Sequence, residues 1–389
     1  MKAVVWHGKE DVRVDSVPDP IIQEPTDAIV RITSTAICGS DLHLYAKLSP
    51  IMREGDIIGH EPMGIVEEVG ADVEHIAPGD RVVIPFNISC GHCYFCDQQL
   101  YSQCETTRDR GKLPQAVNLL GRGRGASLFG YTHVYGAVPG GQAEYLRVPQ
   151  AHFGPIKVPE GPPDERFLYL SDVLPTSWQA VAYADVPDGG TLGVWGLGPI
   201  GQMCARIALH QGAGRVIGVD TVPERLSLAA KYGVETVDFG AVENVRDVLL
   251  ELTEGRGVDA AIDAVGMEAS GSLVGSILQT TKVQLDRGTA LRECMSAIRR
   301  GGTLSLSGVY TGPIQAFPLG DLFDMQIQVR MGQGNVRRWV DDIMPLLNDD
   351  DPLGTEDLKT HEMPLDDAPL GYEIFQKKRD GAIKIVLKP

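Results

Sequence analysis

The sequence predicts an α/β protein of two domains, a small β-barrel or crumpled antiparallel sheet followed by a doubly wound parallel sheet. Short β-branched runs separated by Gly, Pro and Asp fill the first third of the chain, which is typical of an antiparallel domain. After about residue 175, strands alternate with helices, and this alternation indicates a parallel sheet. A chain of 389 residues is also long for one hydrophobic core.

The strands expected in the first domain are short and rich in valine and isoleucine. Pro78 and Gly79 supply the turn that leads into one of them. The expected strands are "AVVWHG" (3–8), "AIVRIT" (28–33), "GIVEEVG" (64–70), "RVVIP" (81–85) and "AEYLRVP" (143–149).

In the second domain, strand-like and helix-like patterns alternate along the chain. The expected strands are 191–196, 215–220, 234–239, 258–266 and 303–310. The expected helices between them are 199–212, 223–233, 245–253 and 290–302.

These patterns predict the domain boundaries. We expect a first domain over 1–175 with a four-cysteine lobe at 90–104, a second domain over 176–334, and a return to the first domain over 335–389. Two longer segments interrupt the patterns. The glycines of 121–141 do not match a phosphate-binding loop, and 267–290 is longer than a short crossover requires.

Charge and composition exclude some classes of partner. The chain holds 35 Lys and Arg against 52 Asp and Glu, a formal net charge of −17 that disfavours nucleic acid and anionic membranes. No apolar run approaches the ~20 residues that span a bilayer. The N-terminal segment reads as a strand and a turn without the pattern of a signal peptide. We therefore expect a cytoplasmic protein.

Four of the seven cysteines form a compact group. Cys90, Cys93, Cys96 and Cys104 are separated by two, two and seven residues. In a cytosolic chain such crowding favours metal over disulfides, and four thiolates complete a tetrahedral Zn²⁺ shell with no open position. The spacing predicts a structural zinc site. An iron–sulfur cluster is the less favoured alternative, since no proline follows the last cysteine, and paired disulfides are another.

A glycine motif marks the start of the second domain. Gly196, Gly198 and Gly201 form G-x-G-x-x-G after an expected strand, with Pro199 and Ile200 opening the following helix. This context predicts a Rossmann dinucleotide site with the pyrophosphate at the helix N-terminus.

The strand that follows the motif ends on Asp220, nineteen residues after Gly201. Its carboxylate would bind the adenosine ribose hydroxyls and repel a 2′-phosphate, which favours NAD over NADP. Arg225 is placed to reach such a phosphate. The alternative is a glycine-rich turn in a fold that binds another ligand.

An aspartate in an apolar run raises the question of a second metal. Asp172 lies within "YLSDVLPTSW" (169–178), and burying an unpaired carboxylate is unfavourable. One explanation is that Ser171 or Asp172 caps a helix. The other is a metal, since "AICGSDLH" (36–43) and "IIGHEPMG" (57–64) add the candidate ligands Cys38 and His60.

Together these motifs resemble the zinc-dependent medium-chain alcohol dehydrogenases over nearly the whole chain. The matching patterns are C-G-[ST]-D-x-H, G-H-E, P-G-D-R-V, the four-cysteine lobe and G-x-G-x-x-G, in that order. The resemblance implies a GroES-like catalytic domain and a Rossmann NAD-binding domain. It also implies two Zn²⁺ per chain, the catalytic ion held by Cys38, His60 and Asp172. The third ligand is a cysteine in many relatives.

The resemblance implies roles for further residues. Ser40 would take the proton of the substrate hydroxyl and pass it through the nicotinamide ribose to His43, unless the two are merely turn and surface residues. Glu61 would orient the metal shell or approach the metal, unless it pairs elsewhere in the barrel. Phe86 would line the substrate pocket, or else be core. Thr176 would touch the nicotinamide or cap a helix, and Lys384 would contact the pyrophosphate or be solvated. Asp41 is expected to hold its loop, and Cys204 and Cys294 to be small core residues.

The branch and the substrate are less defined. "LSDVLPT" (170–176), "GGQAEYLRVP" (140–149) and the 267–290 insert resemble the glutathione-independent formaldehyde dehydrogenase and dismutase branch, in which an insertion holds NAD tightly. We therefore expect an NAD-linked enzyme for short alcohols and aldehydes, as a homodimer or homotetramer. A polyol or amino-alcohol dehydrogenase is one alternative. A zinc-less NAD(P)-binding protein without enzymatic activity is the other.

Overall fold

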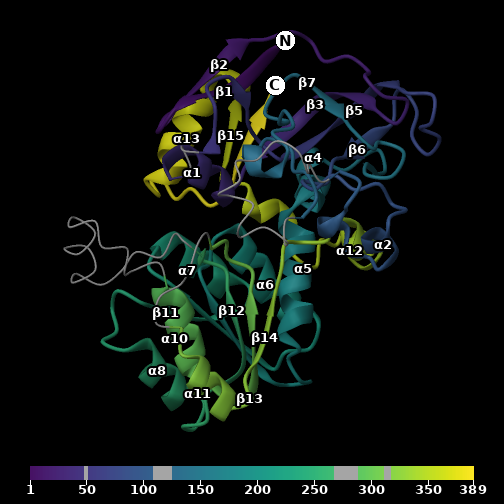
Figure 1. Cartoon of the computed structure of the whole chain (residues 1–389). Coiled ribbons are helices and arrows are strands. Elements are labelled where there is room, and N and C mark those ends of the chain that lie inside the picture. The colour runs from purple at the N-terminus through teal and green to yellow at the C-terminus, as the bar shows by residue number, and fades with distance from the viewer. Residues whose placement is uncertain (48–50, 108–124, 267–287, 311–316) are drawn as a thin grey trace. The chain divides into compact units, whose positions relative to one another are not determined.

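The computed structural model describes residues 1–47, 51–107, 125–266, 288–310 and 317–389. The chain divides into two compact units (Figure 1). Unit 1 comprises 1–175 and 334–389, and unit 2 comprises 176–333. Of the 267–290 insert only 288–290 lie within the described residues, and of the 121–141 loop, 125–141.

Unit 1 is built on two sheets. The first has the strand order β2-β1-β4, and the second runs β15-β16-β3-β5-β6-β8, with β7 also paired to β3. All these pairings are antiparallel except that of β15 with β16, as expected for a domain of short strands joined by turns. The strands are β1 (Lys2–Gly8), β2 (Asp11–Ser16), β3 (Ala28–Ile37), β4 (Asp56–Ile57), β5 (Glu61–Val69), β6 (Arg81–Val83), β7 (Tyr145–Val148), β8 (Ile156–Lys157), β15 (His361–Pro364) and β16 (Ile385–Lys388).

Short helices connect and cover these sheets. The C-terminal α13 packs Tyr372 and Phe375 into a core shared with Trp6, Ile37 and Leu44. The helices are α1 (Gly39–Ala46), α2 (Tyr94–Asp97), α4 (Asp164–Phe167), α12 (Val336–Ile343) and α13 (Ala368–Gln376), with α5 (Val173–Ala184) running from unit 1 into unit 2. The 3₁₀ turns are Tyr101–Gln103, His133–Tyr135, Leu168–Ser171, Met344–Leu346, Thr355–Leu358 and Leu365–Asp367.

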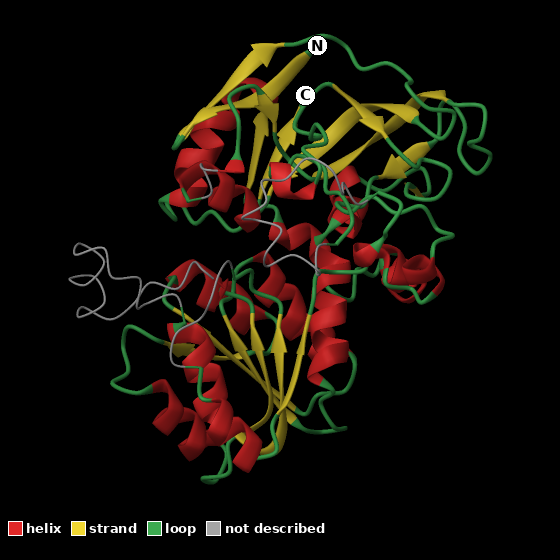
Figure 2. Cartoon of the chain, in the orientation of Figure 1, coloured by secondary structure: helices red, strands yellow, loops and turns green. Residues whose placement is uncertain are grey.

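The described residues of unit 2 form one sheet of six parallel strands in the order β11-β10-β9-β12-β13-β14, with helices on both faces (Figure 2). This confirms the predicted doubly wound parallel sheet. The strands are β9 (Thr191–Trp195), β10 (Arg215–Asp220), β11 (Glu235–Asp238), β12 (Val258–Asp263), β13 (Ile298–Leu306) and β14 (Gln328–Met331). The helices are α6 (Pro199–His210), α7 (Pro223–Lys231), α8 (Val245–Leu252), α10 (Thr289–Ala297) and α11 (Leu319–Asp324).

One boundary differs from expectation. We expected a helix over 290–302, but α10 ends at Ala297 and the chain enters β13 at Ile298, which pairs with Val258. Arg299 then binds Asp259 on β12, with Nε 2.6 Å from Oδ1. Because this pairing lies between segments distant in sequence, the local helical pattern did not reveal it. Cys204 and Cys294 are fully buried, as predicted.

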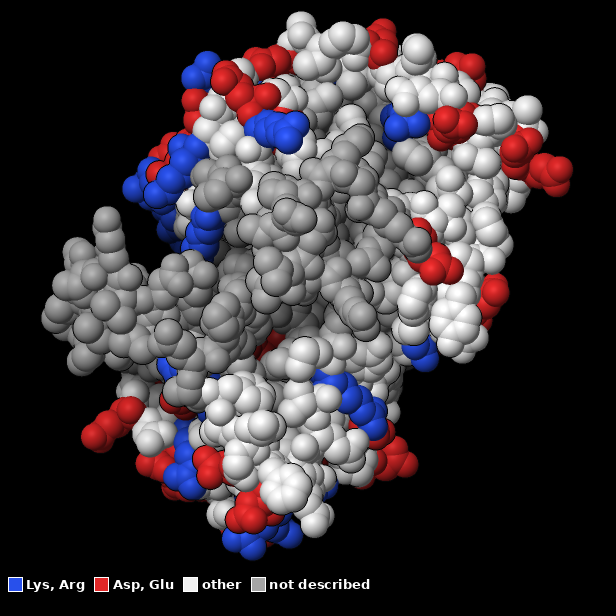
Figure 3. Space-filling view, viewed as in Figure 1, with Lys and Arg blue, Asp and Glu red and all other residues white. Residues whose placement is uncertain are grey.

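The surface carries mixed charge. On the face in Figure 3 acidic and basic side chains are interspersed over the described residues, although the chain is acidic overall. Within the described part of the chain, no helix combines the length and the apolar character needed to cross a membrane.

Candidate functional site

Three segments of unit 1 bring a thiol, an imidazole and a carboxylate together. Cys38 stands between β3 and α1, His60 directly precedes β5, and Asp172 directly precedes α5. Asp172 Oδ2 lies 3.5 Å from Cys38 Sγ and 3.6 Å from His60 Nε2. These three residues and Glu61 are buried, and their possible ligand atoms all lie within 4.8 Å of one another.

Asp41 holds two of these residues in place. Its Oδ2 accepts a hydrogen bond from Cys38 N at 2.9 Å, and its Oδ1 lies 3.0 Å from His60 Nδ1. Gln142 Nε2 donates to the same Oδ2 at 3.3 Å, and the buried Tyr372 hydroxyl donates to Gln142 Oε1 at 2.8 Å. Asp41 thus holds its loop, as expected, and also leaves His60 Nε2 facing Cys38 and Asp172. The sequence did not indicate that Gln142 and Tyr372 contact Asp41, because both are far from it in the chain.

Helix α1 contributes Ser40 and His43 on one face, since residues three apart are neighbours on a helix. Ser40 Oγ lies 3.1 Å from His60 Nε2, within hydrogen-bond distance. His43 is only 4% exposed, so the alternative of a surface histidine is wrong.

Glu61 and Lys384 form a fully buried ion pair beside the cluster. Lys384 Nζ donates to Glu61 Oε1 at 2.6 Å, and neither side chain is exposed. Glu61 Oε2 is buried and has no hydrogen-bond partner among the described residues. The alternative of a solvated Lys384 is therefore wrong. Its side chain as it lies is engaged with Glu61 inside unit 1 rather than open to a pyrophosphate.

The electrostatics of the cluster suit a cation. Burial raises the pKa of the Cys38 thiol to about 11, and Glu61 adds to that rise. Burial alone would lower the pKa of His60, but Asp41 and Cys38 outweigh it and raise that pKa well above its ordinary value. A divalent cation would reverse both preferences, because metal ligation requires a thiolate and a neutral imidazole.

The residues present fit a catalytic zinc. Sulfur, nitrogen and carboxylate oxygen are the ligands that Zn²⁺ takes in proteins, and three protein ligands leave one position open. Ser171 ends the preceding 3₁₀ turn, and its Oγ donates back to Leu168 O at 2.6 Å. Asp172 stands where a cap would, but its Oδ2 is directed at Cys38 and His60. The unpartnered Glu61 Oε2 adds further negative charge at this place.

Two aromatic rings flank His60. The rings of Phe86 and Tyr131 meet it edge-on, with centroids 6.2 and 6.3 Å away. Phe86 was expected as a pocket wall, whereas sequence reasoning missed Tyr131, which lies in a loop without secondary structure. Burial raises the pKa of the Tyr131 phenol, so the hydroxyl stays neutral in ordinary buffers.

The four-cysteine lobe forms a second cluster. Cys90, Cys93, Cys96 and Cys104 are all buried, with their Sγ atoms within 4.8 Å of one another. Cys90 Sγ lies 4.0 Å from Cys96 Sγ, and Cys93 Sγ lies 3.9 Å from Cys104 Sγ. These separations are too long for S–S bonds, which span about 2.05 Å. The geometry fits a closed tetrahedral metal site.

Unit 2 presents the glycine motif at the carboxyl end of β9. Gly196 has φ +85°, and a Cβ on Gly201 would lie 1.7 Å from Gly196 O, so both positions require glycine. A Cβ on Gly198 would meet nothing closer than Arg225 Nη1 at 3.8 Å. The turn is therefore closely packed at Gly196 and Gly201 and open at Gly198, next to the start of α6, as phosphate binding requires.

Asp220 lies beside this turn at the end of β10. Its Oδ2 accepts from Leu197 N at 2.7 Å, and its Oδ1 accepts from Thr221 N and Val222 N at 2.6 and 2.9 Å. Arg225 Nη1 lies 3.8 Å from Asp220 Oδ2. The carboxylate is thus fixed next to the motif, with a guanidinium at its side.

Thr176 was expected either to touch the nicotinamide or to cap a helix. Thr176 lies inside α5, which begins at Val173, so the alternative of a helix cap at Thr176 is wrong.

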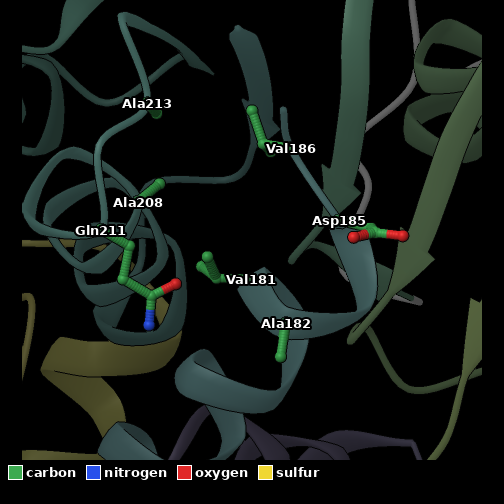
Figure 4. A pocket seen from close by; sticks show the side chains of 7 residues that line it. All are labelled: Val181, Ala182, Asp185, Val186, Ala208, Gln211 and Ala213. Carbon is green, nitrogen blue, oxygen red and sulfur yellow. The ribbon is translucent and has the colours of Figure 1, made fainter. Parts of the chain in front are cut away.

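A pocket of about 180 Å³ lies where α5 and α6 end and is lined by Val181, Ala182, Asp185, Val186, Ala208, Gln211 and Ala213 (Figure 4). Five of its seven lining residues are Val or Ala, and none of the seven belongs to either candidate metal cluster.

Comparisons with known proteins give one result across the chain. Residues 24–160 match the model of the alcohol dehydrogenase GroES-like domain, and residues 199–284 match that of the zinc-binding dehydrogenases. The chain is 43% identical, over the full length of both proteins, to an uncharacterized zinc-type alcohol dehydrogenase-like protein, AdhB, of Bacillus subtilis (strain 168).

Two further relatives extend this result. Formaldehyde dismutase of Pseudomonas putida is 31% identical, with 100% of this chain and 97% of the relative covered. The solved structure of alcohol dehydrogenase TADH from Thermus sp. ATN1 superposes with a TM-score of 0.82 at 33% identity, covering 100% and 99% of the two chains.

Proposed function

The chain belongs to the zinc-type alcohol dehydrogenase family, and we propose that it is an NAD(H)-linked enzyme that interconverts short alcohols and aldehydes. Membership makes it an oxidoreductase. The observation that carries the proposal is the buried convergence of Cys38, His60 and Asp172 from three separate segments. Formaldehyde is the leading candidate aldehyde, supported by the full-length similarity to a formaldehyde dismutase.

We assign a catalytic zinc to Cys38, His60 and Asp172, and a structural zinc to the four-cysteine lobe. When bound, the catalytic ion would supply Lewis-acid polarisation of the substrate oxygen. Asp41 keeps His60 in the tautomer that presents Nε2 to the cluster. Phe86 and Tyr131 exclude water from the side of His60 that they cover.

We assign proton transfer to two residues of α1, Ser40 and His43. Ser40 Oγ exchanges the proton of the substrate hydroxyl, because it already lies beside the metal-facing nitrogen of His60. His43 on the same helical face is the proposed last group of this relay, since histidine titrates near neutrality.

Glu61 and Lys384 set the charge around this site. Lys384 neutralises one oxygen of Glu61, and the free Oε2 remains available to orient the metal shell. We therefore assign Lys384 first to Glu61. A contact with the cofactor pyrophosphate would require its side chain to move.

The proposed cofactor is NAD, which would supply the hydride acceptor. Gly196, Gly198, Pro199, Ile200 and Gly201 form the phosphate turn and the start of α6. Asp220 favours a free ribose over a 2′-phosphate, and Thr176 is the proposed contact to the nicotinamide. Arg225, beside Asp220, moderates this preference.

The test is a cofactor-resolved assay. The zinc-loaded protein is assayed for oxidation of C1–C4 alcohols and reduction of the matching aldehydes, each with NAD(H) and with NADP(H). We expect activity with NAD(H) at least about tenfold above that with NADP(H), since the carboxylate repels the extra phosphate. Absence of activity with both cofactors, in the presence of two zinc ions per chain, would refute the proposed reaction.

Asp220→Ala tests the source of the preference. The variant should raise the KM for NAD and narrow the NAD/NADP ratio, because Arg225 would then face the 2′-position without its counter-charge. Asp188→Ala, which removes an exposed carboxylate of unit 2, is the matched control. An unchanged cofactor ratio in Asp220→Ala would rule out this role.

A further inference from the structure

Asp263 is a fully buried carboxylate that the proposed reaction leaves without a role. It is the last residue of β12 and is 0% exposed. Its Oδ1 accepts hydrogen bonds from Val265 N at 2.9 Å and Gly266 N at 3.1 Å. Its Oδ2 accepts a hydrogen bond from the hydroxyl of Tyr310, four residues beyond β13. One side chain therefore joins the segments that follow two neighbouring strands.

Backbone contacts reinforce this junction. Asp263 O accepts from Ser307 N at 3.0 Å and from Gly308 N at 2.8 Å. A Cβ on Gly308 would lie 2.3 Å from Gly266 N, so the two backbones are in direct contact. Segments 264–266 and 307–310 thus form one compact ledge, which we call the Asp263 ledge.

The Asp263 ledge adjoins the glycine turn. Ala264 N donates to Trp195 O at 2.9 Å, and a Cβ on Gly196 would lie 2.6 Å from Val265 Cγ2. The strand order of unit 2 reverses between β9 and β12. In open parallel sheets, ligands bind outside the carboxyl ends of the strands at this reversal. The ledge therefore lies at the position where the fold places a dinucleotide.

The two halves of such a sheet have different tasks. The glycine turn and Asp220 belong to β9 and β10, the half that takes the pyrophosphate and the adenosine ribose. Each half of a Rossmann sheet binds one mononucleotide, so the half that begins with β12 is left for the nicotinamide nucleotide. Asp263 and Tyr310 hold the first two loops of that half together.

We propose that Asp263 and Tyr310 are positioning residues for the nicotinamide half of the cofactor. They act by holding 264–266 and 307–310 in one fixed arrangement before the cofactor arrives. Preorganisation of this kind strengthens binding because the loops need not be ordered during association. This inference rests on the proposed use of NAD(H).

The test compares the binding of NADH, the whole cofactor, with the binding of ADP, which lacks the nicotinamide half. Wild-type protein and Tyr310→Phe are freed of retained nucleotide by dialysis against charcoal, and their dissociation constants for NADH and ADP are measured by calorimetry. Tyr310→Phe removes only the hydroxyl that binds Asp263. We expect about tenfold weaker NADH binding, equivalent to about 1.4 kcal/mol, and ADP binding changed by less than about twofold, because ADP lacks the nicotinamide half.

Three further variants, Tyr183→Phe, Asp263→Asn and Asp263→Asn combined with Tyr310→Phe, separate positioning from general loosening of the fold. Tyr183→Phe on α5 removes a hydroxyl from unit 2 outside the ledge and should leave both constants unchanged. Asp263→Asn combined with Tyr310→Phe should weaken NADH binding no more than the larger single effect, because the amide oxygen still accepts from Val265 N and Gly266 N and both changes remove only the contact between Tyr310 and Oδ2.

Three results would overturn the inference. The first is NADH binding by Tyr310→Phe within twofold of wild type, and the second is an equal loss of ADP binding. Multiplicative effects in the double variant are the third. Failure of the wild type to bind either nucleotide would instead refute the proposed cofactor, which separates the two hypotheses.

Discussion

Among the described residues of unit 1, two buried groups of side chains could bind a metal, and they differ in where their residues lie along the chain. The four-cysteine cluster takes all its sulfur atoms from residues 90–104. The Cys38 cluster takes its side chains from positions 38, 60, 61 and 172, of which Cys38, His60 and Asp172 are the proposed ligands. A metal in the first would be enclosed by four like ligands, whereas the three proposed ligands of the second mix sulfur, nitrogen and carboxylate oxygen and would leave one position open.

Under the proposed function, this difference separates a stabilising site from a reactive one. A closed shell of thiolates has no place for a substrate, so a metal bound there would only hold the lobe together. The Cys38 cluster is surrounded by groups that do more than ligate, because Ser40 contacts His60 and Asp41 contacts both Cys38 and His60. The comparison predicts that damage to one cluster affects turnover and damage to the other affects stability.

Removing the carboxylate of the Cys38 cluster should have the largest effect on activity. Asp172→Ala leaves only two ligands, so the catalytic zinc should be lost and kcat/KM should fall by about three orders of magnitude, equivalent to about 4 kcal/mol. Zinc content should drop from two ions per chain to one. Asp366→Ala, at a surface ion pair with Lys2, is the control. Retention of two zinc ions with normal turnover would show that Asp172 is not a ligand.

Disturbing the support of the same cluster should have an intermediate effect. Asp41→Asn places an amide where both Cys38 N and His60 Nδ1 need an acceptor. Loss of such a supporting carboxylate weakens metal affinity by about 10- to 100-fold, measurable by competition with a chelator. Asp80→Asn, at a carboxylate that pairs with Lys157, is the matched control. Wild-type zinc affinity in Asp41→Asn would mean that Asp41 serves the loop alone.

Opening the four-cysteine cluster should have the smallest effect on turnover. Cys96→Ser should release the lobe zinc and lower the Tm by about 5–10 °C, while kcat/KM at 25 °C stays within about fivefold. Cys204→Ser, at a buried cysteine of unit 2 outside both clusters, controls for loss of a thiol. Calorimetry with parallel zinc analysis is the measurement. Loss of activity on the scale of Asp172→Ala, without unfolding, would abolish the distinction between the clusters.

Local patterns explain which predictions succeeded. The glycine motif and the alternation of strands with helices are written in consecutive residues, so the parallel sheet of unit 2 followed from them. The end of α10 did not, because Ile298 joins β13 through its pairing with the distant Val258. The local sequence also allowed a helix to start at Thr176, whereas α5 begins at Val173.

Spacing along the chain was enough to predict the four-cysteine lobe, the glycine turn and the family resemblance. The folded structure was needed to show that Lys384 is buried against Glu61, that Tyr131 flanks His60, and that Asp263 joins Tyr310. The packing of strands and helices brings together side chains that lie 47 to 323 residues apart in these three contacts. No local propensity or spacing records that packing, so contacts of this kind can be read only from the folded chain.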